Sequence, residues 1–195
     1  GCAIARSDEA KTLGIKMGAP YFQIRHLEDE AGLVALSANF TLYGDMSDRM
    51  MTLAAGLGHR QEVYSIDESF LRVEHTAHLY GGTVQMGHVI RRRIRRWTGL
   101  PVCVGIGETK TLAKFANHLA KKNACFDGVC DVAAMSQGEL EQWMRGIAVS
   151  EVWGVGRRLT ERLARWKVNT VHDLVTADIK RLRAEFGVVL ERTVS

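Results

Sequence analysis

Two neighbouring carboxylates, Asp67 and Glu68, are the residues of this sequence best suited to chemistry. They follow the apolar run 63–66, where uncompensated acids are costly. Mg²⁺ compensates such charge because it prefers carboxylate oxygens and keeps positions open for substrate phosphates. Two such ions can stabilise the attacking and leaving oxygens of an in-line phosphoryl transfer. A solvated hairpin tip without metal is the alternative, since acid pairs are also common at turns.

Two strand-like runs, 62–66 and 69–73, flank the acid pair and predict a β-hairpin. Neighbouring side chains of a strand point together only near its end or at a turn, which fits this placement. A helix at 39–57 is expected before the hairpin. After it we expect a helix at 84–97 with Trp97 on its apolar face, a buried strand at 101–106, and a helix from the cap Thr109 to about Lys122.

The two ends of the chain differ in the secondary structure that their sequences predict. Near the N-terminus we expect a helix at 4–13, a turn at 18–20 and a short buried strand at 32–37. After Gly128, short helical stretches follow with no convincing strand between them. The sequence therefore predicts an α/β part that runs to about residue 128 and a small all-helical part after it. The helical stretches of the second part are expected at 136–145, 149–153, 157–166, 170–176 and 178–186.

A glycine-containing turn followed by two arginines begins at Trp153. Gly154 and Gly156 allow backbone N–H groups to approach a phosphate, and Arg157 and Arg158 add positive charge beside them. Such a hairpin between helices would grip a DNA backbone without reading its bases. The arginines at 91–96 could form a second basic face, but the solvated side of an amphipathic helix explains them as well.

Composition excludes several classes of protein. The chain is 46% hydrophobic, enough for a core, and its net charge of +4 only slightly favours an anionic partner. Its four cysteines have irregular spacing and no CxxC pair, which argues against a disulfide framework or a zinc knuckle and suits a cytosolic protein. The histidines form no HExxH pattern, and each is expected to be a surface or core residue. No apolar run approaches the roughly 20 residues of a membrane span.

Ser65-Ile66-Asp67-Glu68 resembles the SIDE signature of the Y-family translesion DNA polymerases. Further segments resemble motifs of that family, in the same order and over nearly all of the chain. Their residues are most similar to the UmuC branch, the catalytic subunit of bacterial SOS DNA polymerase V. These segments are 4–14 (a fingers helix), 43–50 (Y-x-x-x-S-x-R), 105–114 (G-I-x-x-x-K-x-x-A-K), 120–122 (A-K) and 152–156 (the thumb helix-hairpin-helix).

The resemblance implies a role for each site residue. Asp67 would bind the catalytic metals, two Mg²⁺ ions being expected, and Glu68 would help bind the ion that activates the primer 3′-hydroxyl. Lys121 would contact the incoming triphosphate. Lys11 lies where other members carry a basic residue that binds the triphosphate. Many members have Thr and Tyr where this chain has Ala5 and Asp8, so Arg6 is the residue expected to replace those phosphate contacts.

The resemblance also implies an architecture: partial fingers at 1–38, a palm at 39–128 with helices packed on a mixed sheet, and a thumb with a helix-hairpin-helix at 129–195. The family needs one more metal-binding aspartate and a steric-gate aromatic residue. Both are expected before Gly1, and a little-finger domain is expected after Ser195. We therefore expect a fragment that is inactive by itself.

The expected activity is error-prone, template-directed DNA synthesis opposite damaged bases. Its partners would be primer-template DNA and deoxynucleoside triphosphates, with a processed UmuD dimer, RecA and the sliding clamp implied by the resemblance, no membrane, and a bacterial cytoplasmic, nucleoid-associated location. Two alternatives stay open. One is a helix-hairpin-helix DNA glycosylase with Asp173 as its catalytic aspartate, and the other is a non-catalytic DNA-binding accessory protein.

Overall fold

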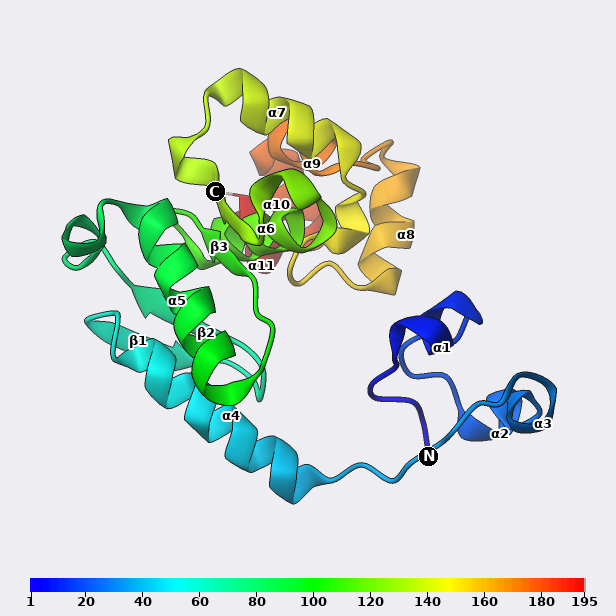
Figure 1. Cartoon of the computed structure of the whole chain (residues 1–195). Coiled ribbons are helices and arrows are strands. Elements are labelled where there is room, and N and C mark those ends of the chain that lie inside the picture. The colour runs from blue at the N-terminus through cyan, green and yellow to red at the C-terminus, as the bar shows by residue number, and fades with distance from the viewer. Residues whose placement is uncertain (195) are drawn as a thin grey trace. The chain divides into compact units, whose positions relative to one another are not determined.

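The computed structural model describes residues 1–194, and the chain divides into two compact units, Gly1–Asp45 and Met46–Ser195. The boundary falls within helix α4, Phe40–Ala55, which contributes its last ten residues to the second unit. Figure 1 labels the α-helices of both units and the strands β1, β2 and β3. Because the division leaves the expected limits at 38 and 128 untested, the fingers, palm and thumb ranges stay predictions.

The first unit contains three short helices: α1 (Asp8–Thr12), α2 (Tyr21–Ile24) and α3 (Leu27–Ala31). The helix expected at 4–13 is shorter because the Ser7 side chain caps it, accepting a hydrogen bond from the N–H of Ala10. The strand expected at 32–37 is wrong. Gly32 ends α3 in the left-handed region, and Val34 and Leu36, which were to be buried, are 75% and 87% exposed.

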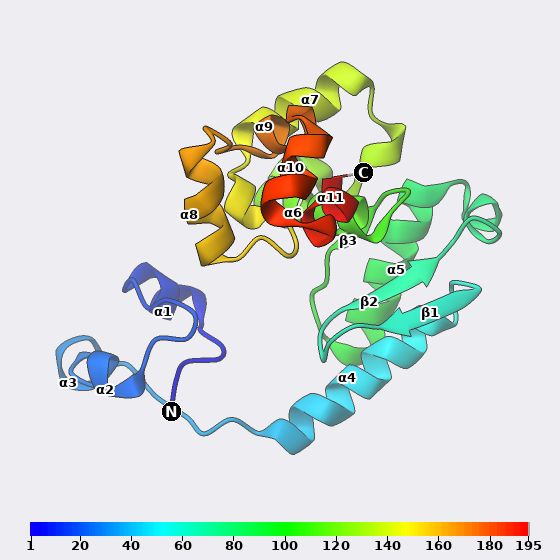
Figure 2. The same ribbon diagram turned by 180° about the vertical axis from the view of Figure 1, so that it is seen from behind.

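The predicted β-hairpin is confirmed in the second unit. Strands β1 (Arg60–Val63) and β2 (Ser69–Arg72) pair antiparallel, with Val63 opposite Ser69 next to the turn. Figure 2 shows the two strands side by side with α4 beneath them. The side-chain amide of Gln61 donates to the carbonyl of Met51 (3.0 Å) and so ties β1 to α4.

Two more strands form a separate parallel pair with two long helices against it. Helix α5 (Thr83–Thr98) precedes β3 (Val104–Ile106), and helix α6 (Lys110–Lys122) connects β3 to β4 (Val129–Asp131). The expectation of no strand after residue 128 is wrong: β4 has only three residues, all buried, so it offers no alternation to read. Within residues 1–194 the four strands therefore form two two-stranded sheets, where one mixed sheet was expected.

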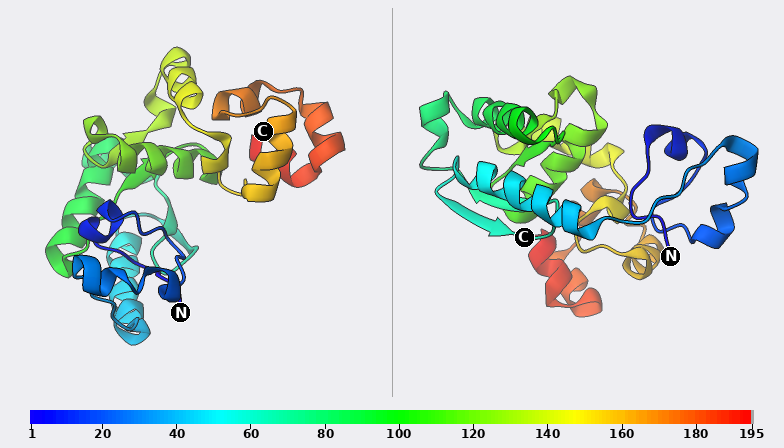
Figure 3. Two further views of the ribbon diagram at one scale, coloured as in Figure 1. Left: turned by 90° about the vertical axis from the view of Figure 1, so that its right-hand side faces the viewer. Right: turned by 60° about the horizontal axis from the view of Figure 1, so that its bottom comes forward.

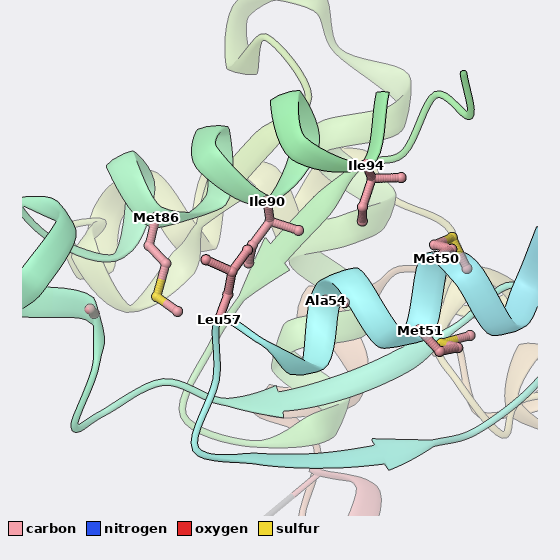
Figure 4. Packing of buried hydrophobic residues seen from close by; sticks show 8 residues of the cluster. Met50, Met51, Ala54, Leu57, Met86, Ile90 and Ile94 are labelled. Carbon is pink, nitrogen blue, oxygen red and sulfur yellow. The ribbon is translucent and has the colours of Figure 1, made fainter. Parts of the chain in front are cut away.

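The core beside the hairpin lies between α4 and α5. Figure 4 shows Met86, Ile90 and Ile94 pointing from α5 toward the side of α4 that carries Ala54, with Leu57 beneath Ile90. Trp97, expected on the same apolar face, is 71% exposed. The buried positions of α5 recur every four residues, so Trp97 lies off that stripe in the last turn of the helix.

The C-terminal part is helical, as predicted, and Figure 3 shows its helices gathered around one another. Leu163, Leu174 and Leu182 are at most 1% exposed at the centre of this cluster. Within residues 1–194, no helix combines the length and apolar character that a bilayer crossing requires. The α-helices are α7 (Gln137–Gly146), α8 (Arg157–Arg165), α9 (Val171–Thr176), α10 (Ile179–Phe186) and α11 (Val188–Val194); 3-10 turns lie at η1 (Ala77–Tyr80), η2 (Ala124–Phe126), η3 (Val132–Ala134) and η4 (Val149–Glu151).

Candidate active site

The turn between β1 and β2 carries both predicted carboxylates. The N–H groups of Tyr64 and Ser65 donate to the carbonyl of Glu68 (3.0 and 3.1 Å), which closes the turn. The hydroxyl of Ser65 donates to Asp67 Oδ1 (2.7 Å), and the hydroxyl of Ser47, on α4, donates to the carbonyl of Ile66. Asp67 and Glu68 therefore lie together at a turn that is held from two sides, and Asp67 is exposed.

Helix α6 brings a lysine to this turn. Lys114 Nζ lies 2.6 Å from Glu68 Oε1, and its side chain is only 23% exposed. One turn earlier, Lys110 Nζ lies 2.5 Å from Glu62 Oε2 on β1. Lys121 follows seven residues after Lys114, on the same face of the helix and about 10 Å farther along its axis. It is exposed and has no partner among residues 1–194.

Two glycines let α6 approach this closely. A Cβ on Gly105 in β3 would lie 2.1 Å from the backbone N of Asn117 and 2.2 Å from the carbonyl oxygen of Ala113. A Cβ on Gly107 would lie 2.8 Å from the Cβ of Leu112. The hydroxyl of Thr109 accepts from the N–H of Leu112 and starts α6 directly after these glycines. The sequence thus fixes where Lys114 meets Glu68.

An aromatic cluster joins the hairpin to the helical part. Trp153 Nε1 donates to the Tyr64 hydroxyl (3.0 Å), and the two rings meet edge to face with centroids 5.2 Å apart. The Phe70 ring lies 5.8 Å from the Trp153 ring. Lys114 Nζ lies 5.1 Å from the Tyr64 centroid and 5.6 Å from that of Trp153, within cation–π range. The hairpin and the segment of Trp153, which are far apart in sequence, therefore both contact a lysine of α6.

A cavity of about 220 Å³ lies behind the carboxylate turn. Asp67, Glu68 and Lys114 border it, and Met86 and Ile90 are among its apolar walls. Apolar walls do not suit a polyanion, because its charge would lose hydration there without compensation. A phosphate ligand would therefore approach the carboxylates from their solvent side.

The glycine turn predicted to hold a phosphate begins directly after Trp153. Gly154 has φ +89°, which glycine adopts without strain. Gly156 precedes α8, and no side chain caps that helix end. Arg157 Nε bonds to Glu161 Oε1 (3.0 Å), whereas Arg158 is exposed and has no partner in the described part of the chain.

Arg6 and Lys11, the two predicted nucleotide-binding residues of the first unit, have local partners. Arg6 Nη1 donates to the carbonyl of Ile15 (2.8 Å), and its Nε is buried without a hydrogen-bond acceptor. This guanidinium is therefore partly committed to holding its own loop. Lys11 Nζ lies 3.4 Å from Asp8 Oδ1, and its side chain is 52% exposed.

The pKa values of two groups outside the turn, Asp173 and Cys130, are shifted from their usual range by identifiable contacts. Hydrogen bonds from the N–H groups of Asn169 and Thr170 lower the pKa of Asp173, whose carboxylate forms the capping box of α9. Asp173 therefore serves as a helix cap, which removes the residue on which the glycosylase alternative depended. Burial raises the pKa of the Cys130 thiol to about 11, so this cysteine is protonated and inert at neutral pH.

Sequence analysis did not identify Lys114, Tyr64 and Trp153 as parts of the site. A signal for Lys114 was present, because it stands seven residues before Lys121 on one helix face. The contact between Trp153 and Tyr64 joins residues 89 positions apart, and neither a motif nor periodicity reports such a distance.

Comparison with known proteins adds a family and several relatives. The impB/mucB/samB family profile matches residues 1–118. Protein ImpB of Salmonella typhimurium is 42% identical over 194 residues, covering 100% of this chain and 46% of ImpB. Protein UmuC of the same species is 43% identical over 195 residues, with 100% and 46% covered. The chain therefore spans about half the length of the curated relatives it matches.

Solved structures share the fold. The insertion ternary complex of Dbh DNA polymerase matches with a TM-score of 0.75 and 22% identity, covering 96% of this chain and 54% of that one. The similarity supports the predicted mixed α/β architecture. The site around Asp67 and Glu68 lies on that shared fold, in the second unit of the chain.

Proposed function

This chain belongs to the impB/mucB/samB family, and on that basis we propose that it is part of an error-prone translesion DNA polymerase of the UmuC type. The observation that carries the proposal is the turn in which Asp67 and Glu68 lie together, held by Ser47 and paired with Lys114. The relative with the matching fold is named as a DNA polymerase in a ternary complex, which agrees with this reaction. The glycosylase and accessory-protein alternatives have no comparable support.

The carboxylate turn fits a divalent metal ion. Its donors are oxygens only, and two adjacent carboxylates are what Mg²⁺ binds when substrate phosphates complete its coordination. We propose that Asp67 and Glu68 hold two Mg²⁺ ions together with groups from the rest of the protein. When bound, the ions would neutralise the charge that develops on the transferring phosphoryl group.

Lysines of α6 would compensate the negative charge of Glu68 and of the nucleotide triphosphate. Lys114 keeps Glu68 oriented through a charge-assisted hydrogen bond of 2.6 Å. Lys121, exposed on the same face of α6, would bind the triphosphate of the incoming nucleotide. In the first unit, Lys11 and, to the extent that its bond to Ile15 allows, Arg6 would add further phosphate contacts.

The turn at 152–156 and the start of α8 would hold the DNA backbone as a helix-hairpin-helix. The N-terminus of α8 has no side-chain cap, so its backbone N–H groups are open to a phosphate oxygen. Arg158 is exposed beside them, and Arg157 could leave Glu161 for a phosphate because that ion pair is exposed. Such contacts would position DNA without reading its sequence.

The organisation and the partners follow from the same proposal. We assign the fingers to 1–38, extend the palm from 39 through β4 because β4 pairs with β3, and assign the thumb to the helices after it. The substrates would be primer-template DNA and deoxynucleoside triphosphates. A processed UmuD dimer, RecA and the sliding clamp would be partners in the full-length protein, at the bacterial nucleoid.

The test is primer extension past an abasic site by the full-length protein with Mg²⁺. Asp67→Asn and Glu68→Gln keep the size of each side chain, so we expect each to lower the extension rate at least about 100-fold, as loss of a transition-state contact does. Binding of primer-template DNA should stay unchanged. Glu141→Gln, at a partly exposed position of α7, serves as the matched control. Normal extension by either site variant would refute the assignment.

A further inference from the structure

Three metal-ligating side chains meet at the other end of the hairpin from the carboxylate turn. They are His59, just before β1, and Glu74 and His75, just after β2. Their candidate ligand atoms all lie within 4.8 Å of one another. The two imidazole rings have centroids 4.9 Å apart, and His59 Nε2 lies 3.6 Å from Glu74 Oε1. Sequence analysis expected surface or core histidines, because His59 and His75 lie 16 positions apart and form no HExxH pattern.

The backbone holds these residues at fixed positions. The N–H of His59 donates to the carbonyl of Arg72 (3.1 Å), which continues the β1–β2 ladder by one more bond. On the other strand, the carbonyl of Val73 accepts from the N–H groups of Thr76 and Ala77 (3.0 and 2.9 Å), so the chain turns directly after His75. The three side chains therefore extend from the ends of β1 and β2, which backbone hydrogen bonds hold together.

The donor set differs in kind from that of Asp67 and Glu68. Two imidazoles and one carboxylate suit Zn²⁺, whereas Mg²⁺ prefers oxygen ligands. The Glu74 side chain is about half exposed, and that of His59 is 30% exposed, so both can rotate to close on an ion.

We propose that His59, Glu74 and His75 form a second metal site, for Zn²⁺ or a similar transition-metal ion, at the base of the hairpin. A bound ion would link residue 59 to residues 74 and 75 and so close the segment that contains the carboxylate turn. It would take no part in the reaction, and a fourth coordination position would stay open to water. The site is independent of the function proposed above, because none of its residues contacts Asp67 or Glu68.

Zinc titration of the full-length protein, stripped with a chelator and kept in excess Mg²⁺, tests the site. Excess Mg²⁺ competes with Zn²⁺ for the oxygen ligands of the carboxylate turn, and replacing Cys2 and Cys125 by serine removes the two exposed thiols. We expect His59→Ala and His75→Ala each to weaken binding of one Zn²⁺ at least about 100-fold, since a ligand matters at least as much as the groups behind it. His172→Ala, which removes an imidazole from α9, should change nothing.

A variant that removes no ligand gives an independent measurement. Arg72 Nε lies 3.8 Å from Glu74 Oε1 and opposes a second cation there. Arg72→Gln should therefore tighten Zn²⁺ binding several-fold. Zinc should also raise the melting temperature of the parent protein but not that of His75→Ala, because an ion that binds only the folded state stabilises it. Unchanged zinc affinity in both histidine variants, or an equal loss in His172→Ala, would overturn the proposal.

Discussion

At the scale of single residues, the pairing of Lys114 with Glu68 is the contact most specific to this site. The ammonium is mostly buried among Tyr64 and Trp153, and it lies where a metal ion would also place positive charge. The Lys114 ammonium and a metal ion bound to Glu68 would repel each other, because both are positively charged and would share that carboxylate. Lys114 therefore orients Glu68, and at the proposed Mg²⁺ site it would at the same time weaken metal binding.

Replacing Lys114 by methionine should separate these two effects. Loss of a unit charge about 4 Å from a cation is worth at least about 1 kcal/mol, the value in bulk water, so half-maximal synthesis should need at least roughly fivefold less Mg²⁺. The maximal rate should fall because Glu68 loses its orienting partner. A Mg²⁺ titration of primer extension measures both quantities.

Lys122→Met is the matched control, because Lys122 lies on the same helix, is exposed and has no partner in the described chain. It should leave the Mg²⁺ requirement unchanged. A higher Mg²⁺ requirement in Lys114→Met would mean that the lysine assists metal binding, contrary to this account.

At the scale of elements, the seating of α6 on β3 determines where the lysines lie. Gly105 makes this possible, since any side chain there would collide with backbone atoms of α6 that cannot rotate away. Core residues of α6 also hold the helix in place, since Ala116 and Leu119 are fully buried. The position of Lys114 is therefore a property of the β3–α6 unit as a whole.

Gly105→Ala should lower the free energy of unfolding by at least about 2 kcal/mol, because α6 must shift to admit the methyl group. Urea denaturation measures this loss. Gly138→Ala is the matched control: a Cβ at that position in α7 meets no atom within 4 Å, and alanine favours a helix, so stability should rise slightly. Equal stability of Gly105→Ala and the parent would contradict the proposed role of Gly105.

Local patterns of the sequence were sufficient for most elements and for the turn of the candidate site. The hairpin, α5 and α6 were predicted because periodicity, caps and turn residues are properties of a few neighbouring residues. The segment 32–37 was assigned wrongly because its apolar residues, though strand-like, have no partner strand among residues 1–194. Strand β4 was missed because its only strong determinant is pairing with β3.

At the scale of the whole second unit, Trp153 links the proposed DNA-holding turn to the carboxylate turn. Its ring packs on Tyr64 and Phe70, and the next residue begins the glycine turn. The two turns are thereby held in register through one side chain, although 80 or more residues separate them in sequence. Phosphate binding at the start of α8 would thus fix DNA at a defined distance from Asp67 and Glu68.

Trp153→Ala should lower the rate of nucleotide addition about tenfold or more while the Kd for primer-template DNA changes little. Small errors of position are costly to a reaction that depends on alignment, whereas the phosphate contacts themselves are intact. Single-turnover kinetics and a binding titration measure the two quantities separately. Trp166→Ala removes a comparable ring that packs on Phe186 within the helical part, and it should keep the parent's rate. Parallel losses in both variants would point to general loosening of the fold.

The hairpin register carries one more consequence, which concerns evolution. Arg60 faces Arg72 and Val63 faces Ser69, so five residues, 64–68, complete the turn. Adding or deleting one residue there would either separate Asp67 from Ser65 and Glu68 from Lys114, or turn alternate side chains of a strand to the opposite face. Insertions and deletions among homologous genes should therefore be excluded between codons 60 and 72, while the exposed segment 32–39 is free to vary in length.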